Sequence, residues 1–159
     1  MASSAPDITI VNDSDVLISN WDVGTVQANT DSNILKALIW NNKGGSNALS
    51  DLRDVTITSL DTDGGTSSDV VAGKWVQINV PKMDGNQTTW AAIGGYTTRS
   101  LRSDALSASD GAVIRGTAND GSTTNSTANY CTIRLKVHVP LNAMPGTKNW
   151  KMRINGYYT

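Results

Sequence analysis

The chain of 159 residues contains no glutamate, no phenylalanine, one cysteine and one histidine. A single cysteine excludes a disulfide within the chain, and one cysteine with one histidine cannot supply a Cys/His metal site. No apolar run reaches the roughly 18 residues that indicate a membrane-spanning helix. The opening residues, Met1–Asp7, have neither a basic nor an apolar stretch and so do not resemble a signal peptide. We therefore expect no cofactor, no membrane span and no export signal.

An excess of positive charge is also lacking. The 13 lysines and arginines are scattered among 14 acidic residues, all of them aspartate, and the net charge is −1. Nucleic-acid-binding proteins typically carry a basic stripe, so nucleic acid is not an expected partner. Glutamate favours helices, whereas threonine and valine favour strands. A threonine-rich chain without glutamate therefore argues against a helical bundle.

The clearest pattern lies in residues 130–139, where apolar and polar side chains alternate strictly. A period of two predicts a strand with one buried face and one solvent-exposed face. Residues 150–158 show the same pattern after a turn-rich stretch, and we expect the two strands to form an antiparallel hairpin. A single helical turn is conceivable at 102–109. Further strands are predicted at 16–21, 34–40, 55–60, 74–80, 88–93 and 112–117.

Short strands separated by Gly, Asn and Ser predict an all-β fold, an antiparallel β-sandwich of about seven or eight strands. The chain is expected to be a single domain over residues 1–159. Residues 1–7 are expected to form an N-terminal arm, and residues 83–111 and 118–129 to form long loops. Loops of this length within a domain are usually functional or mobile.

Candidate catalytic residues are few. His138 lies on the polar face of the predicted strand without a carboxylate nearby in the sequence, which favours a surface residue over a general base. Cys131 lies on the apolar face, which favours a buried and unreactive thiol. Aspartate pairs suitable for glycoside hydrolysis have no apolar cleft-like context. An enzyme is therefore the least favoured class, and we expect no catalytic residues.

The segment Asp61-Thr62-Asp63-Gly64-Gly65, with Asp69 downstream, resembles the opening of a calcium-binding loop. An EF-hand requires a bidentate glutamate at its twelfth position, where this chain has Ala72. Aspartate and glycine are also common turn residues, so a turn is favoured. A calcium site formed by Asp61, Asp63 and Asp69 is the weaker interpretation.

The five tryptophans divide into two groups. Four lie within predicted strands and are expected in the core, because no phenylalanine is available to fill it; these are Trp21, Trp40, Trp75 and Trp150. Trp90 lies with Tyr96, Arg99 and Arg102 in the long loop 83–111. Tryptophan, tyrosine and arginine are enriched at protein interfaces, so these four residues are the candidate interface or ligand site.

Three segments carry a resemblance to a known class of proteins. Residues 39–45, then 50–57, and later 139–146 before an aromatic final strand, are similar to small immunoglobulin-like proteins of phage virions. Such modules occur in tail, baseplate and capsid-decoration proteins, and adhesin modules of cell surfaces share the pattern. The resemblance implies an immunoglobulin-like β-sandwich, and it carries no functional residue over to this chain.

We expect a non-enzymatic virion structural protein that associates with copies of itself or with other virion proteins. It would be made in the host cytoplasm and then act in the virion. The alternative is a carbohydrate-binding or adhesin module that presents exposed Trp or Tyr to surface glycans. The positions of three aromatic residues distinguish the two functions; these are Trp90, Tyr96 and Trp150. Their burial against another chain would support the virion structural protein. Their exposure in a coplanar row would support the glycan-binding module.

Overall fold

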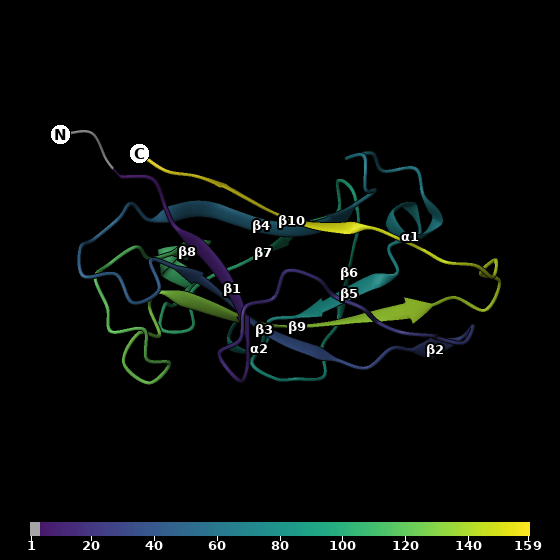
Figure 1. The fold of residues 1–159 in the computed structure, drawn as a ribbon, viewed down its shortest axis with the longest axis horizontal. Helices are drawn as coiled ribbons and strands as arrows, with labels where there is room; N and C mark the ends of the chain where they lie inside the picture. Colours follow the sequence, from purple (N-terminus) through teal and green to yellow (C-terminus); the bar gives the residue numbers. More distant parts are fainter. Residues whose placement is uncertain (1–3) are drawn as a thin grey trace.

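The computed structural model describes residues 4–159, which form two antiparallel β-sheets (Figure 1). The prediction of an all-β chain with antiparallel strands is confirmed. The described residues contain ten strands rather than seven or eight. Three of these have only two residues each, which is too short for an alternating pattern to reveal. None of the helices in residues 4–159 has the length and apolar character to cross a membrane.

The larger sheet has six strands: β1 (Ile8–Asn12), β2 (Thr30–Asp31), β3 (Leu35–Asn41), β5 (Val76–Asn79), β6 (Ala91–Ile93) and β9 (Tyr130–Val139). Their order is β1–β3–β9–β5–β6, and β2 also pairs with β9. The strictly alternating β9 is therefore an interior strand, with its apolar face toward the core. Most of β3 is buried on both faces, since residues 37–41 are all buried.

The smaller sheet contains β4 (Leu52–Leu60), β7 (Arg99–Ser100), β8 (Val113–Ile114) and β10 (Lys151–Tyr157). Its order is β10–β4–β7, and β8 also pairs with β4. Short helical turns, α1 (Asp69–Ala72), α2 (Pro81–Asp84) and η1 (Ala108–Asp110), connect the strands. The turn η1 overlaps only the end of the segment in which a helical turn was conceivable.

One apolar core lies between the two sheets. Ile39 and Ile133 of the larger sheet and Val55 and Ile57 of the smaller sheet are almost completely buried in it. Burying a side chain of this size stabilises the fold by about 1.5–3 kcal/mol relative to exposure. A second, smaller cluster lies on the outer face of the larger sheet and consists of Val11, Leu38, Trp40 and Tyr130.

The predicted hairpin between residues 130–139 and 150–158 is wrong. β9 pairs with β2, β3 and β5, whereas β10 pairs with β4 in the other sheet. The connection through residues 140–150 therefore crosses from one layer to the other. Alternation identifies each strand correctly, but it carries no information about the partner strand.

Two other sequence-based expectations need correction. Residues 16–21 form no strand beyond an isolated bridge between Leu17 and Val11, because Ile18 and Trp21 turn toward the space between the sheets. Residues 83–111 are not one loop, since β6, β7 and η1 lie within them. The expected arm, residues 1–7, is described only from Ser4. Its Asp7 backbone N–H donates to Asn41 Oδ1 at 3.1 Å.

Residues 118–129 contain no strand, and asparagine side chains hold this loop in place. Asn129 Nδ2 donates to the carbonyls of Thr117 (2.8 Å), Arg115 (3.1 Å) and Asn41 (3.3 Å). Asn119 Nδ2 donates to the carbonyl of Asn42 at 2.6 Å. The turn after β3 is thereby joined to a loop about 75 residues later in the chain.

Candidate functional site

An apolar cleft opens between the two sheets where β1 and β10 are the outermost strands. Its volume is about 360 Å³, and buried core residues such as Ile39, Ile57 and Ile133 form its floor. Half-buried apolar side chains form its walls, namely Ile10, Ile18, Trp21, Leu35, Trp150 and Met152. The core is therefore incompletely covered along this edge of the molecule.

Trp21 and Trp150 meet at the cleft. Their rings contact edge to face, with centroids 5.7 Å apart and planes at 85°. Both side chains are half-buried, whereas Trp40 and Trp75 are buried, so the predicted core location holds fully only for the latter two. Polar residues, including Asn20 and Lys148, also line the cleft. An apolar space with a polar border is the usual composition of a protein interface.

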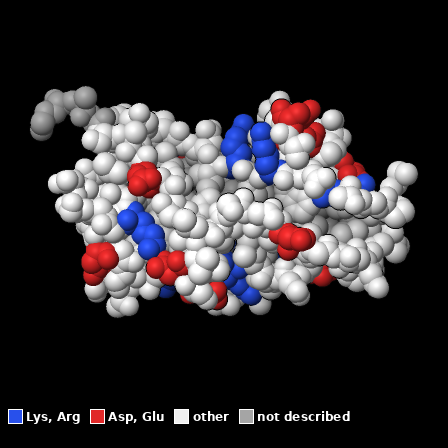
Figure 2. Space-filling model, viewed as in Figure 1, with Lys and Arg blue, Asp and Glu red and all other residues white. Residues whose placement is uncertain are grey.

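The strand β10 borders this cleft and, within residues 4–159, pairs on one side only, with β4. Met152 and Ile154 point toward the cleft, and Lys151, Arg153 and Asn155 are exposed. The unpaired edge of such a strand offers backbone donors and acceptors to another strand. Figure 2 shows charged side chains in small separate groups of both signs, with uncharged surface between them.

Tyr96 lies at the tip of the turn between β6 and β7, on the edge of the sheets opposite β1 and β10. Its exposed fraction is 93%. The turn is tightly held, since Gly94 and Thr97 exchange backbone hydrogen bonds of 2.9 and 3.0 Å and Gly95 N donates to Ser59 O at 2.8 Å. Gly95 has φ +57°, and a Cβ there would lie 3.1 Å from Thr66. A fixed turn thus projects one large aromatic side chain into solvent.

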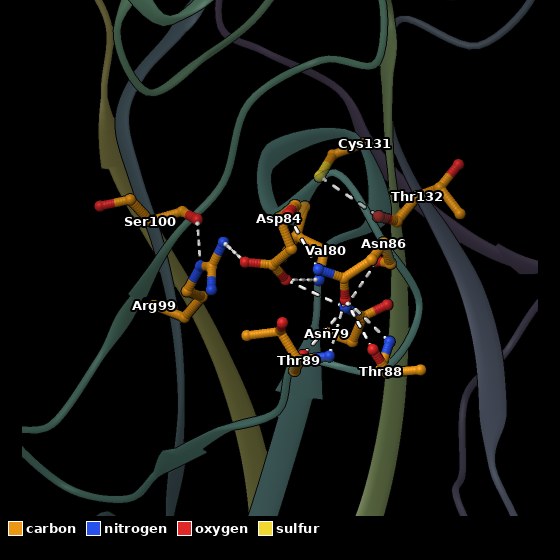
Figure 3. Close-up of polar contacts among 10 residues, drawn as sticks. All are labelled: Asn79, Val80, Asp84, Asn86, Thr88, Thr89, Arg99, Ser100, Cys131 and Thr132. Carbon is orange, nitrogen blue, oxygen red and sulfur yellow. Dashed lines mark hydrogen bonds and ion pairs between the residues drawn. The ribbon is translucent and has the colours of Figure 1, made fainter.

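The other three predicted interface residues are engaged within the molecule. Arg99 Nη2 lies 2.8 Å from Asp84 Oδ1, and this ion pair is mostly buried (Figure 3). Trp90 is half-buried on the outer face of the larger sheet, where Lys136 Nζ lies 4.4 Å from its ring centroid. Arg102 is half-buried. Of the four, Tyr96 has the exposure expected of an interface residue, and no coplanar exposed row with Trp90 and Trp150 is formed.

The aspartates of the possible calcium loop do not converge on one point. Asp61 accepts hydrogen bonds from the backbone N–H groups of Ser67 and Ser68. Hydrogen bonding by the Ser68 side chain, and then by these two backbone groups, lowers the pKa of Asp61. Asp63 accepts from Gly65 N at 2.8 Å, and Asp69 forms an ion pair with Lys148 at 2.6 Å. Within residues 4–159, no three acidic, His or Cys side chains are placed to hold a metal ion. These aspartates organise turns.

Cys131 is completely buried, and burial raises the pKa of its thiol to about 12. A thiol in this state is an unreactive core residue at neutral pH, as its place on the apolar face predicted.

His138 differs from the expectation in one respect, because Asp31 of β2 supplies the carboxylate that its sequence neighbours lack. Its Nδ1 lies 2.6 Å from Asp31 Oδ1, and Lys136 Nζ lies 2.7 Å from Asp31 Oδ2. The three side chains form a partly exposed charge cluster at the end of β9.

The strongest candidate site is therefore the apolar cleft, which the sequence did not reveal. Its walls come from β1, β3, β10 and residues 18–21, and only the folded chain brings them together. Comparisons with protein families, curated proteins and solved structures found no match to this chain. The cleft and the opposite edge of the sheets are therefore the features from which a function can be inferred.

Proposed function

We propose that this protein is a non-enzymatic structural protein of a phage virion that associates with copies of itself or docks on other virion proteins. The fold would be an immunoglobulin-like β-sandwich. The observation that carries the proposal is the apolar cleft at the β1/β10 edge, with the free edge of strand β10 beside it among residues 4–159. The near-zero net charge of −1 is compatible with close packing of many copies.

The cleft favours a macromolecular partner on energetic grounds. Each apolar wall residue that a partner covers gains roughly 25 cal/mol for every Å² removed from water. The edge of β10 adds a second attraction, because an incoming strand can pair with its backbone while its side chains enter the cleft. Assembly would thereby complete the part of the core that a single chain leaves open.

A second copy of the chain is the partner that the two edges favour. The cleft lies at the β1/β10 edge, and Tyr96 projects from the opposite β6/β7 edge. A projecting side chain and a complementary cavity on different surfaces give a head-to-tail contact, which builds rings or filaments. Tyrosine suits this role, because its ring is apolar and its hydroxyl can reach polar groups at the border of the cleft.

Sedimentation velocity over a range of concentrations tests the proposal. We expect the wild type to form oligomers and the Tyr96→Ala and Ile18→Asp variants each to lose them. Tyr96→Ala removes the projecting ring, and Ile18→Asp places a charge in the cleft. Leu141→Ala is the control, because Leu141 is also exposed (76%) but lies outside the cleft.

Mixing the two variants gives the sharper result. Tyr96→Ala retains an intact cleft and Ile18→Asp retains the projecting tyrosine, so a head-to-tail contact restores heterodimers in the mixture. If both variants still associate as the wild type does, the contact between Tyr96 and the cleft is wrong and another surface mediates assembly. The proposed assembly role is not contradicted by that result. A wild type that stays monomeric and binds no isolated capsid or tail protein contradicts the proposed function itself.

A further inference from the structure

A second hollow, of about 460 Å³, lies on the outer face of the larger sheet. Leu38 of β3 and Thr132 of β9 contribute to its floor, and Lys82 of α2 and Thr124 of the loop 118–129 contribute to its walls. This volume is within the range of about 300–1,000 Å³ typical of small-molecule sites. The hollow is separate from the apolar cleft, which lies between the sheets.

Three cations and two carboxylates line this hollow, which gives it a formal charge of +1 (three minus two). Lys36 and Arg134 are direct cross-strand partners in the pairing of β3 with β9, and both line the hollow. Like charges placed opposite each other across a sheet are destabilising. Lys82 is a third cation at the border, and no carboxylate pairs with Lys36 or Lys82 among the ion pairs of residues 4–159. The Asp104 carboxylate lies close enough to Lys82 and Lys36 to interact with them electrostatically, and an anionic group from outside the chain would offset the remaining positive charge.

Contacts behind the cations fix Arg134 in place. Its Nη1 donates to the carbonyl of Gln87, and its guanidinium lies 5.4 Å from the centroid of the Trp90 ring. Trp90 therefore supports the basic side of the hollow from outside, and Lys136 approaches the same ring. This is a role for Trp90 that differs from the direct ligand contact expected from the sequence.

Hydrogen-bond acceptors also line the hollow, which argues against a bare anion as the ligand. Asp13 and Asp104 are both among its lining residues. Asp104 accepts hydrogen bonds from Thr132 N (2.8 Å) and Thr132 Oγ1 (2.6 Å), and burial raises the pKa of its carboxyl. A ligand that fits both sets of groups carries an anion for the cations and hydroxyl donors for the carboxylates. The hydroxyls of Thr123 and Thr124 add further polar groups.

We propose that this hollow binds a carboxylated sugar, with its carboxylate against Lys36, Lys82 and Arg134 and its hydroxyls toward Asp104, Asp13 and the threonines. The sugar unit would be of the uronic or sialic acid kind. The site is independent of the assembly role, because it uses the outer face of β3 and β9 and leaves both edges of the sheets accessible.

Two-dimensional NMR titration of the ¹⁵N-labelled protein tests this site. D-glucuronic acid and N-acetylneuraminic acid are the probes, and D-glucose and inorganic phosphate are the matched controls. We expect saturable shifts of the amides of Lys36, Thr132 and Arg134 with at least one acidic sugar, and much weaker effects with glucose and phosphate. Binding of glucose or of phosphate that is as strong as that of the acidic sugar overturns the proposal. Glucose lacks the carboxylate and phosphate lacks the sugar ring with its hydroxyls. Absence of shifts with both acidic sugars overturns it as well.

Lys36→Gln is the decisive variant. It removes one cation from the hollow and should weaken the binding of the acidic sugar by roughly tenfold, the usual effect of losing one charge-assisted hydrogen bond. Arg153→Gln, on the exposed side of β10, is the control and should bind as the wild type does. Because Lys36→Gln also relieves repulsion with Arg134, its melting temperature should equal or exceed that of the wild type. Unchanged affinity in Lys36→Gln contradicts the site.

Discussion

Arg99 and Asp84 join the two sheets through an ion pair, with Arg99 Nη2 2.8 Å from Asp84 Oδ1. Arg99 belongs to β7 of the smaller sheet, and Asp84 ends the helical turn that follows β5 of the larger sheet. The other carboxylate oxygen accepts hydrogen bonds from Val80 N (2.8 Å) and Asn79 Nδ2 (3.1 Å) (Figure 3). The exposed fractions of the Arg99 and Asp84 side chains are only 18% and 8%. The pair thus lies mostly away from water.

Arg99→Met should destabilise the protein by about 2–4 kcal/mol, because it leaves the Asp84 carboxylate largely buried without its cation. Chemical denaturation followed by tryptophan fluorescence measures the change. Arg53→Met is the matched control, since Arg53 is 44% exposed and lies 3.4 Å from Asp51. The control should change stability by no more than about 0.5 kcal/mol. Equal effects of the two substitutions would show that burial of the Arg99 pair is unimportant.

Asn129→Ala should cost about 2–3 kcal/mol of stability. Its buried amide donates to three backbone carbonyls, and alanine removes all three hydrogen bonds. The Thr117 carbonyl keeps hydrogen bonds from Asn42 Nδ2 (3.2 Å) and Asn119 Nδ2 (3.0 Å), so the loss is concentrated at the carbonyls of Arg115 and Asn41. Asn125 is exposed and donates to Asp120 only, so Asn125→Ala should have little effect. Urea denaturation compares the two variants. Native-like stability of Asn129→Ala would mean that residues 118–129 are held by other contacts.

A largely apolar run locates β3, and alternation in the sequence locates β4, β5, β9 and β10, because each of these strands places an apolar face on the core. It cannot assign partners, and the separation of β9 from β10 into different sheets illustrates this. Residues 16–21 also contain four apolar side chains, yet they form no strand. Ile18 and Trp21 meet apolar surface at the cleft rather than in a sheet. Whether an apolar pattern forms a strand depends here on tertiary contacts.

The sequence singles out Tyr96 as a candidate interface residue of the long loop 83–111, where the structure leaves its side chain 93% exposed. It does not predict the internal partner of Arg99, which lies 15 residues earlier in the chain. The Asp31–His138 contact spans 107 residues, so no local pattern could have indicated it. The cleft is still less accessible to sequence reasoning, since it results from incomplete coverage of the core by segments distant in the chain.

Cys131 should not react with Ellman's reagent in the native protein at neutral pH. Burial raises the pKa of the thiol to about 12, so the reactive thiolate is scarce and the sulfur is also shielded from the reagent. In guanidinium chloride the same thiol should react rapidly and stoichiometrically. The ratio of the two rates measures how rarely the core opens. Fast labelling of the native protein would contradict the packing of β9 against the smaller sheet.

Asp31→Asn should make stability less dependent on pH in the acidic range. Hydrogen bonds from Lys136, and then from His138, lower the pKa of Asp31 below its ordinary value of 3.8. A carboxyl whose pKa is depressed by folding contributes stability above its unfolded-state pKa. That contribution is lost as the pH falls through the folded-state pKa, because the folded protein must then accept a proton it resists.

Thermal melting at neutral pH and near pH 3 checks this prediction. The wild type should melt above Asp31→Asn at neutral pH, and the difference should shrink toward the lower pH. Asp22→Asn is the control, because Asp22 forms no ion pair within residues 4–159 and its only side-chain hydrogen bond there is the local one from Gly24 N. A difference between wild type and Asp31→Asn that is constant with pH would show that the cluster at the end of β9 stabilises the fold through packing. Its charges would then contribute nothing measurable.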